Sequence, residues 1–121
     1  MLNVVVLEGI LARPAQDVEL PSGDRLVSLE VTVRRADGPA EPVPVQWAAA
    51  PAWASVLDAG TEVAVLGQVR RRFFRVGGVT QSRTEVVATR VVRAAGRAKV
   101  RSLMEEAVQV LSATSGGAPS G

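Results

Sequence analysis

The chain has 121 residues, with 14 Lys or Arg, 12 Asp or Glu and a formal net charge of +2. This length suits one domain with its own core and is too short for two. Because the sequence contains neither Cys nor His, it excludes disulfides, thiol catalysis, imidazole acid–base chemistry and the usual zinc sites. We therefore expect a protein that is not an enzyme and that needs no cofactor or metal.

Charge is divided unevenly along the chain. Residues 1–62 contain four basic and nine acidic residues, a net charge of −5, whereas residues 63–121 contain ten basic and three acidic residues, a net charge of +7. A basic half in a small domain indicates an anionic partner, nucleic acid before membrane. The sequence shows no secretory signal pattern and no long apolar run, which predicts a cytoplasmic, nucleoid-associated protein without a membrane partner.

The first part of the chain predicts three strands. Residues 2–11 (LNVVVLEGIL) are almost all aliphatic, which predicts a buried strand with a bulge or close backbone approach at Gly9. Residues 17–20, the turn PSGD and the alternating residues 25–33 predict a hairpin. After a loop rich in proline, residues 43–47 (VPVQW) predict a short third strand, and Pro44 places it at an edge or a bulge.

A short helix and two more strands are predicted next. Trp53, Val56 and Leu57 have helical spacing between residues 48 and 58, so we expect a short helix with Trp53 in the core. Residues 61–76 and 82–92 are strand-like on either side of a Gly-Gly turn. Three strands, a short helix and two strands are the order of an all-β, five-stranded Greek-key OB barrel.

The end of the chain predicts a helix and a tail. We assign residues 1–95 to the OB domain and residues 96–112 to an amphipathic C-terminal helix, whose apolar positions recur at helical spacing. This helix either adds phosphate contacts, mediates assembly or folds back on its own barrel. The small polar residues 113–121 are expected to be disordered.

Three motifs occur in order over about residues 2–93. They are LNVVVLEGILARP, ELPSGDRLVSLEVTV and AGTEVAVLGQVRRRFF. Together they resemble the bacterial single-stranded DNA-binding protein family. The matching positions are Asn3, Val5, Leu7, Gly9, Leu11, Pro14, Gly60, Val63, Val65, Gly67, Val69 and Phe74. The resemblance implies an OB fold, usually a homotetramer, that wraps single-stranded DNA without sequence preference.

One strand carries most of the predicted binding site. Proteins that bind single strands combine a basic groove for phosphates with aromatic rings on which bases stack. Arg70, Arg72 and Phe74 share one face of a strand with a period of two, and the resemblance places DNA-contacting residues at these positions. Phe73, on the other face, is interpreted as packing against the protein.

Each of the other candidates has an alternative interpretation. The resemblance makes Trp47 a further stacking aromatic, and the alternative is an ordinary core or interface tryptophan. Arg34 and Arg35 either contact phosphates or form a solvated loop end. The complete set of predicted residues that bind single-stranded DNA is Arg34, Arg35, Trp47, Arg70, Arg72, Phe74, Arg75 and Arg83.

The chain departs from the family in two places. The loop after the second strand lacks an aromatic residue, and the end of the chain lacks the family's acidic tail. We therefore expect weaker binding and no recruitment of replication or repair proteins through such a tail. The predicted function is sequence-independent single-stranded DNA binding in replication, recombination or repair, as a homotetramer or homodimer. The alternatives are a structural or protein-interaction OB oligomer, or RNA binding by the same face.

Overall fold

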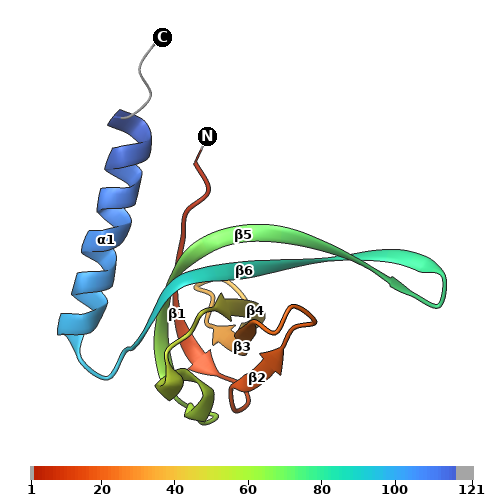
Figure 1. Ribbon diagram of the computed structural model, residues 1–121. Helices are drawn as coiled ribbons and strands as arrows, with labels where there is room; N and C mark the ends of the chain where they lie inside the picture. Colours follow the sequence, from red (N-terminus) through yellow and green to blue (C-terminus); the bar gives the residue numbers. More distant parts are fainter. Residues whose placement is uncertain (1, 117–121) are drawn as a thin grey trace.

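The computed structural model describes residues 2–116, which form a β barrel with one helix beside it (Figure 1). The elements in chain order are β1 (Val5–Leu11), β2 (Gln16–Glu19), β3 (Arg25–Val33), β4 (Glu41–Ala48), the 3-10 turn η1 (Ala52–Val56), β5 (Glu62–Val76), β6 (Val79–Arg93) and α1 (Arg97–Gly116). No helix in this part of the chain is long and apolar enough to cross a bilayer.

Five of the strands close into a ring. The sheet order is β1-β5-β6-β4-β3-β2, and a further pairing between β1 and β3 closes it. All pairings are antiparallel except the short one between β4 and β6, which joins Val45 to Val86 and Gln46 to Val87. The predicted five-stranded OB barrel is confirmed. β2 is the first strand of the predicted hairpin and pairs only with β3.

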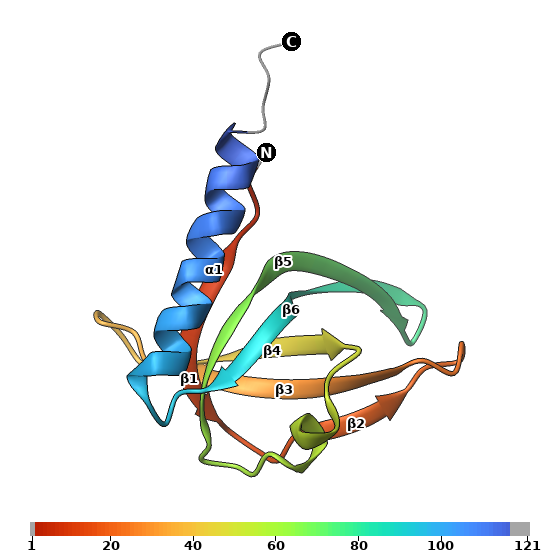
Figure 2. The ribbon, with the colours of Figure 1, turned by 60° about the vertical axis from the view of Figure 1, so that its left-hand side comes forward.

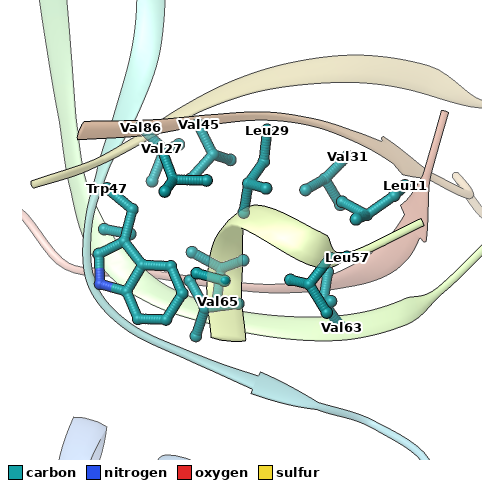
Figure 3. Close-up of a cluster of buried hydrophobic side chains, with 13 residues drawn as sticks. Leu11, Val27, Leu29, Val31, Val45, Trp47, Leu57, Val63, Val65 and Val86 are labelled. Carbon is teal, nitrogen blue, oxygen red and sulfur yellow. The ribbon is translucent and has the colours of Figure 1, made fainter. Parts of the chain in front are cut away.

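The barrel core follows from the period of two in the strands. In β3, Val27, Leu29 and Val31 are buried and the residues between them are half-buried on the outer face. Figure 3 shows these side chains meeting Val45, Trp47 and Val65 from the other strands. Each fully buried aliphatic side chain contributes roughly 1.5–3 kcal/mol, so the alternation both selects the inner face and holds the ring closed.

Two glycines lie where strands approach closely. A Cβ at Gly9 would collide with the carbonyl oxygen of Thr32, and a Cβ at Gly67 would collide with that of Val87. The close approach predicted at Gly9 is confirmed. Gly67 also lies at the register irregularity between β5 and β6, where the two strands leave the ring.

Beyond Gly67 the β5–β6 hairpin becomes an arm, which we define as residues 68–85. It projects away from the ring (Figure 1), and its two strands stay paired up to Val76 and Val79. Gly77 and Gly78 both have positive φ, 58° and 82°, as a tight hairpin turn requires. At the base of the arm, the Asn3 amide donates to the Val69 carbonyl at 2.8 Å and accepts from the Val69 N–H at 2.9 Å.

The expected short helix is instead the single 3-10 turn η1. Its two neighbouring backbone positions, Pro51 and Leu57, are extended, which leaves only five residues for the turn. Ala54 and Leu57 are the buried residues here, and a spacing of three suits a 3-10 turn better than an α-helix. β4 is not the edge or bulged strand predicted from Pro44, because it lies between β3 and β6 in the sheet. Pro44 itself pairs only with Glu30 of β3, since the pairing with β6 involves only Val45 and Gln46.

α1 packs only its first half on the barrel. Its buried residues Val100, Leu103 and Ala107 meet Ala64, Leu66 and Val92 on the outer face of β5 and β6, in a second apolar cluster. The remainder of the helix extends past the ring (Figures 1 and 2), and Met104, Val108 and Leu111 are exposed. The helix runs four residues beyond the predicted end at 112, so disorder over 113–116 was wrongly expected. Residues 117–121 lie outside the described residues.

Candidate functional site

A groove of about 710 Å³ lies on the outer face of the barrel. Most of its lining residues come from the β2–β3 hairpin, from β4 and from the β5–β6 arm. Figure 2 shows that the hairpin and the arm lie on opposite sides of β4. The lining includes the outward residues of β3 and β4, because the alternate residues of those strands fill the core. The charged and amide side chains in the lining are Arg13, Gln16, Glu30, Gln46, Arg70, Arg72 and Arg83.

Three predicted site residues meet in this groove. Arg70 and Arg72 come from alternate positions of β5, and Arg83 comes from the neighbouring strand β6. They share one face because side chains alternate across a strand and the pairing register joins Arg72 to Arg83. The expectation that Arg70 and Arg72 lie on the same face therefore holds, and the structure adds Arg13, which the sequence did not indicate.

Both carboxylates in or under the groove are paired with an arginine. Arg70 donates to Glu85 at 2.7 Å, and Glu85 is fully buried with its second carboxylate oxygen lacking a partner. Arg13 and Glu30 form an ion pair at 2.7 Å. These two pairs neutralise four of the charges, so the remaining positive charge of the groove comes from Arg72 and Arg83.

Arg72 and Arg83 face each other directly. They are cross-strand partners in the register of β5 and β6, and within residues 2–116 neither forms an ion pair with a carboxylate. Like charges opposite each other weaken a sheet. An anion between the two guanidinium groups would relieve this repulsion, which makes the pair a candidate site for a phosphate.

The outer part of the arm carries Phe74 and Arg75. Phe74 is half-buried opposite Gln81 and continues the face of Arg72, and Arg75 donates to the Gly78 carbonyl at 3.2 Å. The interpretation of Phe73 as a packing residue is wrong, since its ring is 67% exposed. This outer part of the arm extends beyond the ring (Figure 1), so it does not lie on the barrel core.

The two tryptophans are placed opposite to expectation. Trp47 is only 6% exposed and fills one end of the core (Figure 3), so its ring is not available for base stacking. It shares the inward side of β4 with Val43 and Val45. Trp53, expected in the core, is 41% exposed and contacts Trp47 edge to face, with ring centres 5.6 Å apart. Trp47 therefore fits the alternative interpretation of a core tryptophan, and the assignment of Trp53 to the core is wrong.

Arg34 and Arg35 lie in the loop after β3, outside the groove. Arg35 is engaged with Glu41 at 2.9 Å and Asp37 at 3.4 Å, and Arg34 is exposed. The structure therefore does not bring these two residues to the other candidates. Their surroundings fit the solvated loop end that was the alternative interpretation.

A closed five-stranded barrel with a basic groove between two hairpins defines an OB-fold protein of the type found in bacterial single-stranded DNA-binding proteins. No family model matches the sequence, and no curated protein matches it. The crystal structure of the single-stranded DNA-binding protein from Thermus aquaticus is similar, with a TM-score of 0.63 and 28% identity. That match covers 76% of this chain and 40% of the Thermus chain, so this chain spans less than half of that protein's length.

A second similar structure is a dimeric one, the N-terminal domain of PriB protein from Thermoanaerobacter tencongensis. Its TM-score is 0.58 at 20% identity, and the match covers 75% of this chain and 94% of that one. At this identity the likeness shows the fold alone. The family resemblance found in the sequence motifs is thus supported by structures, although the sequence itself matches no family model.

Proposed function

We propose that this protein binds single-stranded DNA without sequence preference and without catalysis, during replication, recombination or repair in the cytoplasm. The observation that carries the proposal is the pair Arg72 and Arg83, which are opposite each other in the groove and form no ion pair with a carboxylate of residues 2–116. Such a pair weakens the isolated protein and favours a phosphate-bearing ligand. No base-reading pattern is needed for this kind of contact.

Binding through this groove is mainly electrostatic. The slope of log affinity against log salt concentration becomes more negative by about 0.7 for each phosphate of a single strand that an arginine neutralises. Aromatic stacking adds roughly 1–3 kcal/mol per base, and on the arm only Phe73 and Phe74 can supply it, since the chain has 2 Phe and no Tyr. We therefore expect modest affinity with a strong salt dependence.

The double variant Arg72→Ala, Arg83→Ala tests the proposal. Its affinity for fluorescently labelled oligo-dT, measured by anisotropy at low salt, should fall at least tenfold, and its salt slope should fall by about 1.4, the sum for two phosphate contacts. Its melting temperature should stay equal or rise, because the like-charge pair is removed. The matched control Arg35→Ala removes an arginine outside the groove. Undiminished affinity in the double variant would contradict the proposal.

The second candidate is a structural or protein-interaction OB oligomer. The burial of Trp47 favours it, because it leaves the groove without a tryptophan. The same double variant separates the two functions, since an interaction protein would lose nothing when these arginines are removed. A labelled oligo-rU measured beside oligo-dT tests the RNA alternative.

We also propose that the protein is a homo-oligomer, a tetramer or a dimer, that assembles partly through α1. Met104, Val108 and Leu111 are exposed at helical spacing past the barrel, and a second copy of the same stripe would cover them. Val108→Glu should lower the mass measured by light scattering, whereas Gln109→Glu, beside it on the helix, should not. An unchanged mass for Val108→Glu would rule out this interface.

A further inference from the structure

A second cavity, of about 550 Å³, lies beside the first turn of α1, next to η1 and the end of β6. Trp47, Trp53, Arg90, Arg93 and Lys99 are among its lining residues. Both sites include a residue from the end of β4, because Ala48 lines the groove and the inward-facing Trp47 lines the cavity. None of the residues predicted to bind DNA, other than the misplaced Trp47, belongs to it.

Trp53 presents an aromatic ring at this cavity in a fixed position. Its ring packs at 69° to that of Trp47, and Trp47 is itself held in the barrel core. The short turn η1 between Pro51 and Leu57 fixes the backbone. A large aromatic ring that is partly exposed and supported from one edge is suited to stacking with a flat ligand group.

The charges around Trp53 are positive. Arg93 and Lys99 are exposed, and neither forms an ion pair with a carboxylate of residues 2–116. Arg90 is paired with Glu106 at 2.9 Å, so this pair contributes no net charge. A partly exposed ring and two unpaired cations in the lining of one cavity fit a ligand that joins flat groups to negative charges, as a nucleotide strand does.

The cavity also lies close to the groove along β6. Val87 lines the groove and Arg90 lines the cavity, and three residues of strand span about 10 Å. β4 pairs with β6 only as far as Val87, so no strand of the described chain covers this edge of β6 between the two sites. One continuous strand of nucleic acid could therefore contact both.

We propose that this cavity, defined by Trp53, Arg93 and Lys99, is a second contact site for the single strand that occupies the groove. A base stacks on Trp53, and its flanking phosphates contact Arg93 and Lys99. The inference rests on the proposed function, because it needs a strand bound in the groove. This second site gives the strand a path out of the groove past the end of β4.

The first test compares Trp53→Ala with Trp53→Phe, which keeps a stacking ring. Oligo-dT from about 4 to about 16 nucleotides covers the site sizes found for one OB fold. The shortest oligonucleotides should bind both variants like wild type. The longest should bind Trp53→Ala about fivefold or more weakly, as expected for a lost stack, and Trp53→Phe nearly normally. Equal loss at all lengths, or no loss at any, would overturn the proposal.

The second test uses two cations of α1. Lys99 lines the cavity, whereas Arg101, also exposed and without an ion pair, does not; two residues apart on a helix, they point about 200° apart. Lys99→Ala should reduce the salt slope for long oligo-dT by about 0.7, and Arg101→Ala should leave it unchanged. Identical slopes for both variants and wild type would overturn the proposal.

These results can be distinguished from the case in which the groove does not bind single-stranded DNA. If Arg72→Ala, Arg83→Ala keeps full affinity, the proposed function fails and this inference fails with it. If that variant loses binding while Trp53→Ala and Lys99→Ala bind every length normally, only the second site is rejected. Loss of poly-glutamate binding in Lys99→Ala with oligo-dT binding unchanged would assign the cavity to an acidic peptide instead, and would likewise overturn the proposal.

Discussion

The two halves of β5 differ in burial and in charge. From Val63 to Gly67 every residue is buried, between the core on one side and α1 on the other. From Gln68 onward the same strand is almost entirely exposed and carries Arg70, Arg71, Arg72 and Arg75. The change occurs at Gly67, where the register shifts. One continuous strand thus supplies stability in its first half and charged surface in its second, so the two properties can be altered separately.

A substitution in the buried half should affect only folding. Leu66 is buried in the cluster under α1, and Leu66→Ala should lower the free energy of unfolding by about 2–5 kcal/mol. Val69→Ala, at an exposed position on the same strand, should change it by less than about 0.5 kcal/mol. Urea unfolding measures both. The comparison fails if the two substitutions lower the free energy of unfolding by the same amount. It also fails if the Leu66→Ala variant is folded and yet binds oligo-dT more weakly.

A substitution in the exposed half should affect only binding. Phe74 continues the face of the groove arginines, so Phe74→Ala should cost about 1–3 kcal/mol of oligo-dT affinity, with the melting temperature nearly unchanged. Phe73→Ala is the matched control, because Phe73 is on the opposite face of the same arm. Anisotropy titrations that showed the larger loss for Phe73 would assign the binding face to the other side of the arm.

The smallest effect is expected at the loop after β3. Arg35 is held by Asp37 and Glu41 outside the groove, and exposed ion pairs contribute roughly 0–1 kcal/mol. Arg35→Ala should therefore change oligo-dT affinity by less than about twofold and leave the salt slope unchanged. A slope lowered by about 0.7 would show that this loop contacts phosphate and that the binding surface extends beyond the two halves of β5.

The fold could be predicted because its signals are local. Alternation in residues 25–33, the glycine positions and the Gly-Gly turn each constrain the backbone over a few residues. Arg70 and Arg72 could be placed on one face because residues two apart on a strand share a face. Arg83 joins them through the pairing of β6 with β5, which the period of two alone does not give. The pairing of Arg70 with Glu85 was beyond prediction, since it depends on the register of two strands and on the burial of a carboxylate.

The tryptophans show a different kind of error. Trp47 shares the phase of Val43 and Val45, so the period of two indicates an inward ring, whereas the family resemblance implies a ring exposed for base stacking. Trp53 is predicted in the core because it shares the apolar face of a short helix with Val56 and Leu57. The segment forms only a 3-10 turn, and a change from 3.6 to 3.0 residues per turn rotates side chains to new directions.

The Asn3 side chain bonds both backbone groups of Val69 at the point where β5 leaves the barrel. It extends the ladder between β1 and β5, whose last paired residues are Val5 and Gly67. The arm is thereby preorganised, so a ligand that binds along it does not have to restrict its direction at an entropic cost. Loss of the Asn3 hydrogen bonds would act mainly on the lifetime of the complex, because an arm that moves away from the barrel releases the DNA strand bound along it.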